Sequence, residues 1–414
     1  MKNRILFTQF ALILSSFSVW SQTNNLTGSP YSLFGIGVES NSNTGRNSGM
    51  GRLGLALESD NQINLYNPAS FASIEKERFV FDIGMFTEIQ SISSGGRNEM
   101  RFASNFSNIS LGFNGNGKYG VGLSLRPATS VGYALIGIKS NIEGSNEQFT
   151  TNIDGSGGLS EVRLDYGRKL SSNLNVGIKF SYFFGSVDET ESVIAENSRI
   201  SNNDISYYNG ATMGFGLQYK LKERYNIGLS LDLPTSLGGK QDTNSQKFSF
   251  DGITILEESV DKNIDDFKLP LRFGIGFSTT FKNLLLSADY NSSFWSGTNQ
   301  EDGVGKYVDQ SIFAIGAEFM VNPNSLKYWQ RINFRAGINY NTGYLEIDNN
   351  RVDSYSASFG FGLPIGRNSG SNLNFSYNVG NRGSTNSFLV NENFSTLNLN
   401  LTLSNIWFQQ RKYN

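Results

Sequence analysis

Residues 396–404 read Thr-Leu-Asn-Leu-Asn-Leu-Thr-Leu-Ser, an unbroken alternation of leucine with a small polar residue. Successive side chains of a β-strand point to opposite faces, so the four leucines share one face and the polar residues share the other. The polar face carries no Lys, Glu or Arg, which a strand of a soluble sandwich would show to water. The pattern therefore favours a membrane β-barrel over a β-sandwich, with the leucines toward lipid and the polar residues toward the lumen.

The same alternation recurs in residues 354–363 and 372–380, where aromatic and aliphatic residues oppose Asn, Ser and Gly. Short turns such as Asn114-Gly115-Asn116-Gly117 alternate along the chain with longer polar segments, as in outer-membrane barrels with short periplasmic turns. We interpret the polar segments near 93–98, 141–157, 188–204, 238–267, 297–308, 347–352 and 383–393 as long loops. The sequence between turns and loops predicts an all-β, antiparallel transmembrane barrel of about 14 strands. The strands are predicted at 78–92, 99–113, 118–140, 158–170, 174–187, 205–221, 225–237, 268–281, 284–296, 309–321, 331–346, 353–366, 371–382 and 394–408.

The composition agrees with a lipid-facing surface and excludes several functions. Charged residues are 17% of the chain, aromatic residues are 13%, and the formal net charge is -2. Without a strong positive charge, we expect no nucleic-acid partner. The chain has no cysteine and no histidine, so it lacks the thiolate ligands of zinc and the commonest general base. We therefore expect no metal site, no cofactor and no enzymatic activity, and an outer-membrane enzyme is the least favoured function.

The chain divides into four parts by pattern. Residues 1–21 resemble a secretory signal peptide, with Lys2 and Arg4 before an apolar run that is shorter than a membrane span. Residues 22–77 read as a loop-like hatch, residues 78–408 as the barrel, and residues 409–414 as a short tail. A secreted barrel of this kind is expected in the outer membrane of a Gram-negative bacterium, in contact with outer-membrane lipid.

The segment 45–69 does not read as a strand and has a glycine-rich beginning. A barrel of about 14 strands is wider than side chains alone can fill, so an empty lumen would leak. Glycines allow a backbone to pack closely against the barrel wall, and Pro68 fixes the chain just before the first strand. We interpret the segment as a plug, with a surface loop as the alternative.

Pro127 lies inside the predicted strand 118–140, where a proline removes a ladder hydrogen bond. A closed barrel has no edge strand to accommodate it, so Pro127 predicts a break in the wall. The alternative is that the strand simply ends near Arg126. Three arginines in predicted strands, Arg126, Arg163 and Arg335, could bind a carboxylate headgroup or could pair with a structural acid.

Two short motifs and one strand resemble the FadL-type outer-membrane transporters of long-chain fatty acids and other hydrophobic compounds, in a branch found in the Bacteroidetes. The motifs are Ser48-Gly49-Met50-Gly51 and Asn67-Pro68-Ala69, and the strand is Leu125 to Tyr133. The resemblance implies a barrel of 14 strands, a hatch in the lumen and passive uptake of small hydrophobic ligands. It also implies that the break at Pro127 is a lateral opening through which a ligand leaves for the bilayer.

The resemblance therefore predicts hatch residues Gly49, Met50, Gly51, Asn67, Pro68 and Ala69, and a lateral opening at Arg126, Pro127 and Ala128. The leading function is an outer-membrane channel for small, fatty-acid-like hydrophobic molecules. A related branch, the PorV-like proteins, implies the alternative: a docking or shuttle component that works with proteins of the type nine secretion system.

Overall fold

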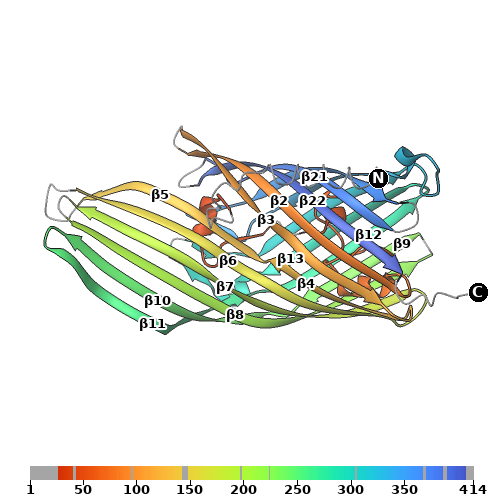
Figure 1. Cartoon of the computed structure of the whole chain (residues 1–414), viewed down its shortest axis with the longest axis horizontal. Coiled ribbons are helices and arrows are strands. Elements are labelled where there is room, and N and C mark those ends of the chain that lie inside the picture. The colour runs from red at the N-terminus through yellow and green to blue at the C-terminus, as the bar shows by residue number, and fades with distance from the viewer. Residues whose placement is uncertain are drawn as a thin grey trace, which may run out of the picture.

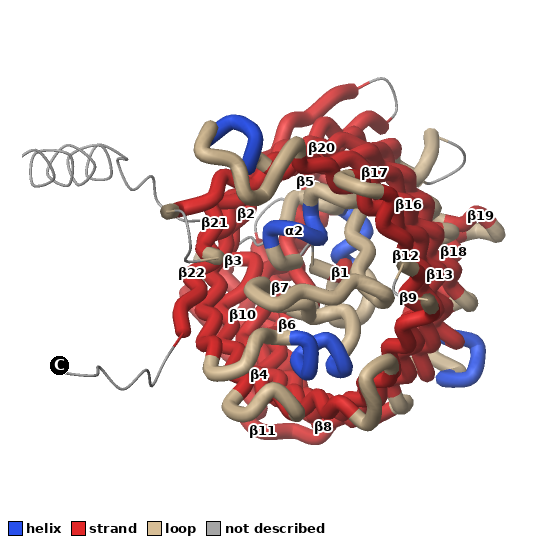
Figure 2. Tube along the Cα trace, turned by 90° about the vertical axis from the view of Figure 1, so that its right-hand side faces the viewer, coloured by secondary structure: helices blue, strands red, loops and turns tan. Residues whose placement is uncertain are grey.

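The chain forms one closed barrel of 14 antiparallel strands (Figures 1 and 2). The computed structural model describes residues 27–406 apart from 41–42, 95–96, 142–147, 196–197, 223, 304, 367–369 and 386–388. The predicted signal peptide and C-terminal tail lie outside the described residues. Strand β2 (Arg78–Ser94) pairs along its length with β22 (Asn391–Ile406), which closes the ring. The predicted strand number and closure are confirmed.

The other strands of the ring follow one another in chain order, each paired with its neighbours. They are β3 (Arg97–Asn114), β4 (Tyr119–Pro127), β6 (Gln148–Lys169), β7 (Leu174–Ala195), β8 (Ser198–Leu221), β9 (Tyr225–Asp232), β12 (Leu271–Phe281), β13 (Leu284–Phe294), β16 (Gln310–Met320), β17 (Asn333–Asn341), β20 (Ser354–Ile365) and β21 (Ser371–Arg382).

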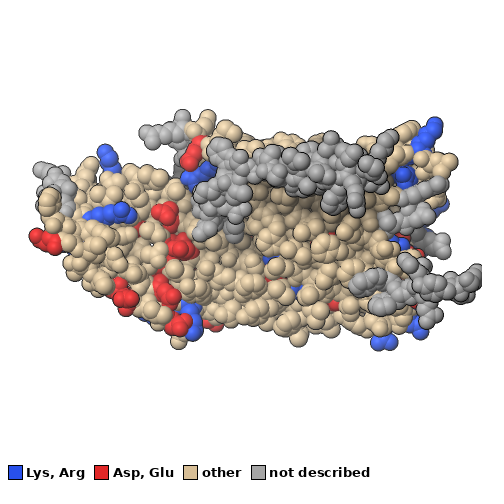
Figure 3. All heavy atoms as spheres, viewed as in Figure 1, with Lys and Arg blue, Asp and Glu red and all other residues tan. Residues whose placement is uncertain are grey.

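The wall exposes apolar side chains on its outer face and buries polar ones on its inner face, the reverse of a soluble protein. In β22 the side chain of Leu397 is 54% exposed, whereas its neighbour Asn398 is 5% exposed and Thr402 is 1% exposed. Charged side chains gather toward the two ends of the face seen in Figure 3, with few between them. An apolar outer band with a polar, buried inner face is the arrangement of a barrel that meets lipid.

Several strands are longer than predicted, and three of the predicted loops are wrong. Most of the described residues of 141–157, 188–204 and 238–267 lie in strands. Strand β6 begins at Gln148, β7 runs to Ala195, β8 begins at Ser198, and β10 (Thr235–Ser249) and β11 (Gly252–Leu269) form a hairpin. These strands extend beyond the rest of the barrel in Figure 1. Both of their faces are polar or half-exposed, so they lack the apolar alternation on which the sequence prediction depended.

Two predicted strands are interrupted. The predicted strand 118–140 breaks after Pro127, and the chain continues as β5 (Thr129–Asn141). The predicted strand 225–237 breaks between β9 and β10, at Leu233 and Pro234. In both places the first piece stays in the ring and the second piece joins the projecting strands, because β5 pairs with β6 and β10 pairs with β8.

The N-terminal residues run inside the ring of strands, as the view along the barrel shows (Figure 2). Their short elements are η1 (Pro30–Leu33), β1 (Val38–Glu39), α2 (Gly45–Ser48) and η2 (Pro68–Ser73). The loops at the projecting end hold η3 (Trp295–Thr298) and a small sheet of β14 (Glu301–Asp302), β15 (Gly305–Tyr307), β18 (Leu345–Ile347) and β19 (Asn350–Arg351), and η4 (Tyr328–Arg331) lies between β16 and β17. No helix among the described residues is long and apolar enough to cross a membrane.

Candidate functional site in the lumen

The chain from Thr44 to Ser73, called here the luminal segment, is held by polar side chains of the barrel wall. Asn67 is the most connected of its own residues and is fully buried. Its Nδ2 donates to the carbonyl oxygens of Leu55 at 2.9 Å, Leu217 at 3.1 Å and Leu229 at 3.1 Å. Its Oδ1 accepts from the backbone N–H of Ala69 at 3.0 Å and so caps η2. One amide side chain thus links the luminal segment to β8 and β9.

Side chains of β13 and β8 hold the turn at Gly54 and Leu55. Oδ2 of Asp289, on β13, accepts from the backbone N–H of Gly54 at 2.7 Å and of Leu55 at 2.9 Å. Gln218, on β8, donates from Nε2 to the carbonyl oxygens of Leu55 at 3.0 Å and Leu57 at 3.1 Å. Backbone groups that have no ladder partner are satisfied in this way by side chains from the wall.

A buried ion-pair network ties α2 to the wall. Glu318 of β16 contacts Arg46 of the luminal segment at 2.8 Å and Arg335 of β17 at 2.7 Å. Arg335 also donates to Asn374 at 2.7 Å. Arg163 likewise pairs with Asp165, with Nε 2.8 Å from Oδ2. Of the two roles considered for Arg163 and Arg335, the structure therefore supports pairing with a structural acid.

Glycines in the wall bring the segment close. Met50 is fully buried, and its carbonyl oxygen lies only 2.4 Å from where a Cβ on Gly316 would be placed. A Cβ on Gly337 would lie 2.3 Å from the backbone nitrogen of Gly51. Any side chain at these two wall positions would therefore displace the segment. The predicted hatch residues all lie in the lumen: Gly49, Met50, Gly51, Asn67, Pro68 and Ala69. The wall residues that receive them were not predicted, because a glycine in a strand gives no signal of what it faces.

The luminal segment borders one cavity on each side. A cavity of about 340 Å³ lies toward the projecting end and is bordered by Arg52, Leu55 and Tyr66 of the segment. A second cavity of about 610 Å³, bordered by Arg46, Glu58 and the short-turn residue Asn173, lies toward the other end. The first cavity has a largely apolar part, which includes Ile36, Leu65, Leu159, Phe183, Leu237 and Phe273.

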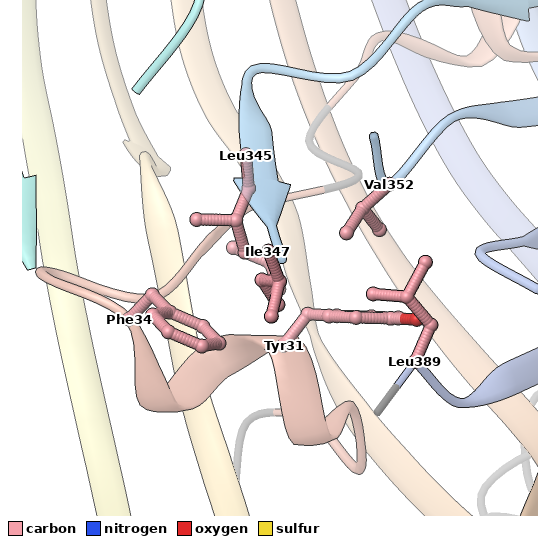
Figure 4. Close-up of a cluster of buried hydrophobic side chains, with 7 residues drawn as sticks. Tyr31, Phe34, Leu345, Ile347, Val352 and Leu389 are labelled. Atoms are coloured by element: carbon pink, nitrogen blue, oxygen red, sulfur yellow. The ribbon is translucent and has the colours of Figure 1, made fainter. Parts of the chain in front are cut away.

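Residues before the luminal segment cover the first cavity. Tyr31 of η1 and Phe34, which directly follows η1, pack with Leu345 and Ile347 of β18 and with Leu389, as the close-up in Figure 4 shows. The Tyr31 hydroxyl donates to the carbonyl oxygen of Val390 at 2.5 Å. Burial raises the pKa of Tyr31 to about 12, so the hydroxyl keeps its proton at neutral pH. The chain thus closes its own lumen toward the projecting end with an apolar cluster.

Arg52 differs from the other cations that line the first cavity. It adopts a left-handed backbone conformation, with φ of 61°, and its Nη2 has no hydrogen-bond partner among the described residues. Burial lowers the pKa of Arg52 and the nearby Glu88 carboxylate raises it, but an arginine stays protonated in a protein. The other Lys and Arg side chains of the cavity each pair with a carboxylate: Arg126 with Glu161, Arg163 with Asp165, Lys179 with Asp232, Arg272 with Glu39, and Arg382 with Glu392. The sequence prediction missed Arg52, because nothing in the sequence shows that its charge is uncompensated.

The wall is interrupted where Pro127 was predicted to break it. Strand β3 pairs with β4 only from Asn114 to Ile109, which lies opposite Leu125. Beyond this point β3 has no partner strand on that side among the described residues, because β5 pairs with β6 and with two residues of β1 instead. Pro127 is the last residue of β4, and Arg126 beside it pairs with Glu161 at 2.6 Å.

The N-terminal residues Thr27 and Gly28 lie in this interruption of the wall. A Cβ on Gly28 would lie 2.6 Å from the Cβ of Arg101 on β3, and a Cβ on Gly132 of β5 would lie 1.9 Å from the carbonyl oxygen of Thr27. Ala128 accepts a hydrogen bond from the backbone N–H of Ser40 at 3.0 Å. Arg126 and Ala128 border the same cavity as Arg52 and Tyr66 of the luminal segment. The residue that hydrogen-bonds to Ala128, Ser40, precedes the luminal segment.

The fold and the luminal segment define an outer-membrane-type β-barrel whose N-terminal chain folds back into the lumen. The chain belongs to the BamG family, whose model matches residues 1–414. Among solved structures it resembles the Pseudomonas putida toluene transporter TodX, with a TM-score of 0.64 and 14% identity over 89% of this chain and 99% of that one.

Two further solved structures share the fold. The Ralstonia pickettii toluene transporter TbuX has a TM-score of 0.57 and 16% identity, over 87% of this chain and 97% of that one. A Pseudomonas aeruginosa FadL homologue has a TM-score of 0.61 and 12% identity, over 89% and 99%. No curated protein matches the chain. The FadL-like fold is therefore confirmed, and at these identities the likeness concerns the fold alone.

Proposed function

We propose that the chain is an outer-membrane channel of a Gram-negative bacterium that takes up small, fatty-acid-like hydrophobic molecules without an energy source. The observation that carries the proposal is the lumen cavity of about 340 Å³, whose lining combines apolar side chains with Arg52, a cation whose Nη2 has no hydrogen-bond partner among the described residues. Ligand sites are typically concave and mostly apolar, with a few polar groups that fix orientation. An apolar chain would occupy the wall, and a carboxylate would meet Arg52.

In this proposal residues 22–77 act as the hatch of a barrel formed by residues 78–408, after removal of the signal peptide. The contacts of Asn67, Asp289 and Glu318 support this role, because they fix the luminal segment to the wall between the two cavities. A ligand can pass only if part of this segment, or the residues that cover the cavity, moves.

The exit is placed at Arg126, Pro127 and Ala128. Three features support a lateral exit there: β3 lacks a partner strand beyond Ile109, Pro127 lacks an N–H for the ladder, and Arg126 and Ala128 border the cavity. An apolar ligand that leaves sideways remains out of water, which is worth roughly 25 cal/mol per Å² of apolar surface. Two of the solved structures of similar fold are toluene transporters, which is consistent with an apolar cargo.

Uptake by vesicles that contain the purified protein tests the exit. Pro127→Val restores a ladder N–H and should lower uptake of a fluorescent dodecanoate analogue. Pro364→Val, in β20 beside the second cavity and far from the interruption at β4, should not. Normal uptake by a folded Pro127→Val protein would remove the lateral exit.

Binding of ligands to the detergent-solubilised protein tests whether Arg52 binds the carboxylate headgroup of the ligand. Arg52→Met should weaken dodecanoate binding by about tenfold or more, since a hydrogen bond to a charged group is worth about 1.5–3 kcal/mol. Binding of dodecanol should change little. If both ligands lose affinity equally, Arg52 shapes the cavity and does not bind a carboxylate.

A second function, docking of secreted proteins in the manner of PorV-like proteins, is favoured by one observation. Strands β6, β7, β8, β10 and β11 extend well beyond the barrel (Figure 1), and most of their residues there are polar. Loss of protein secretion with normal dodecanoate uptake, after removal of the β10–β11 hairpin, would support docking over transport.

A further inference from the structure

The outer edge of β11 is open. Strand β11 pairs with β10 from Leu269 opposite Thr235 to Gly252 opposite Ser249. On its other side, β11 has no partner strand among the described residues, because β12 pairs with β9 and β13. The hairpin is fixed to the barrel through β10, which pairs with β8 over Asn209 to Ser198. A long row of backbone N–H and C=O groups is therefore presented on a firmly attached strand.

This edge also carries apolar side chains in the open. Ile253 is 65% exposed, Ile255 is 60%, Leu256 is 51% and Val260 is 71%, and Phe250 at the hairpin tip is 99% exposed. Native proteins usually shorten, bulge or cover such an edge, since an open edge recruits further strands. The register of β11 against β10 shifts at three places, but regular stretches such as Gly252–Ile255 have no second partner strand among the described residues. An exposed apolar strand edge that projects beyond the barrel wall is therefore expected to have a partner.

Acidic residues greatly outnumber basic residues along this edge. Residues 251–266 contain six acids (Asp251, Glu257, Glu258, Asp261, Asp265 and Asp266) and one basic residue, Lys262, a net charge of -5. The whole chain has a net charge of -2, so the remainder is +3 (-2 minus -5). The edge is thus strongly acidic within a chain whose overall charge is close to zero.

We propose that the open edge of β11 is a docking strand for an extended, Lys- or Arg-rich segment of a partner protein, which adds to the sheet as the next strand. Backbone hydrogen bonds along the edge would supply affinity, and alternate side chains would supply specificity. The acids of β11 would select a basic segment, and Ile253, Ile255 and Val260 would be covered by its apolar residues.

Two other occupants fit the surface less well. A second copy would place two acidic strands side by side, and like charges directly opposite destabilise a strand pair. A metal ion is disfavoured because, among the described residues, no group of three or more acidic side chains is placed to hold one. A basic segment satisfies both the charge and the backbone groups.

Hydrogen exchange of the full-length protein in lipid nanodiscs tests the proposal. The probe is a ten-residue peptide that alternates Lys and Val, compared with a Glu–Val peptide and with a Lys–Val peptide that has a central proline. We expect the Lys–Val peptide to slow amide exchange within residues 252–264 by about tenfold or more, which corresponds to about 1.4 kcal/mol. The other two peptides should have no such effect.

Reversing the acidic charges of β11 tests whether they select the peptide. The variant Glu257→Lys, Glu258→Lys and Asp261→Lys should lose protection by the Lys–Val peptide and gain it from the Glu–Val peptide. A matched control reverses three charges away from the edge, at Asp154, Glu191 and Glu301, and should behave as the wild type. Dodecanoate uptake should be equal in all three proteins, which keeps this proposal separate from the channel function.

Four outcomes would overturn the proposal. Absence of protection by the Lys–Val peptide would show that the edge does not accept a strand. Equal protection by the proline-containing peptide would exclude strand addition, and equal protection by the Glu–Val peptide would exclude selection by charge. Protection that rises with protein concentration in the absence of peptide would make a second copy the occupant.

Discussion

The ring of 14 strands and the strands that project beyond it have the same backbone hydrogen bonding but different surroundings. The outer face of the ring meets lipid, whereas the projecting strands meet water. In β22, Leu397 faces outward and the neighbouring Asn398 is buried against the lumen. In β11, Ile253 and its neighbour Thr254 are both exposed, so both faces of the strand are open there. The comparison teaches that side-chain alternation reports which solvent each face meets, whereas strand pairing itself is independent of that alternation.

The same contrast applies to ion pairs. Glu318 lies in the lumen between Arg46 and Arg335, and each of the three side chains is at most 14% exposed. Lys240 and Asp261 pair at 3.3 Å on the projecting hairpin, where their side chains are 53% and 71% exposed. Breaking a buried pair leaves an uncompensated charge, whereas an exposed pair is screened by water.

The largest expected effect follows from this contrast. Glu318→Gln should lower the free energy of unfolding by about 3–5 kcal/mol, because two guanidiniums then share the lumen without a carboxylate. Asp261→Asn should change it by less than about 1 kcal/mol. Denaturant titration in phospholipid vesicles measures both, and equal effects would contradict the difference between the two parts of the wall.

A smaller effect is expected from a charge placed on the outer surface. Leu397→Arg should cost about 2–4 kcal/mol if Leu397 lies near the bilayer midplane, since a charge on the lipid face is poorly solvated there. Val260→Arg, at a position that is also exposed, should stay within about 0.5 kcal/mol. The same titration measures both variants, and a tolerated Leu397→Arg would place this part of β22 outside the membrane.

The last effect is confined to the luminal segment, and we expect it to change the free energy of global unfolding least. Asn67→Ala removes the donor that serves the carbonyl oxygens of Leu55, Leu217 and Leu229, and each buried group left unpaired costs about 1–3 kcal/mol unless water replaces it. We expect faster hydrogen exchange over residues 45–70 while the barrel strands keep their protection. Asn173→Ala, in an exposed turn, is the control. Unchanged exchange in Asn67→Ala would mean that the segment is held mainly by its apolar packing.

Sequence periodicity and turn signals predicted the barrel and its strand number. The resemblance to FadL-type transporters pointed to Gly49 to Gly51 and Asn67 to Ala69, which lie in the lumen. Periodicity failed at 188–204 and 238–267, where polar residues on both faces of a strand look like loop. It also missed Arg52 and Asp289, because a single charged residue in a loop or a strand does not indicate what it contacts. The break at Pro127 could be predicted from the sequence, because a proline lacks the backbone N–H that a strand needs at that position.

The sequence by itself determined which residues of each strand face lipid and which face the lumen, because alternation is a property of neighbouring residues along one chain. Only the tertiary structure decided that Glu318 joins Arg46 to Arg335, that Gly316 and Gly337 receive the chain at Met50 and Gly51, and that β11 ends the projecting sheet with an open edge. These features join or separate residues far apart in the chain, so no local pattern of residues encodes them.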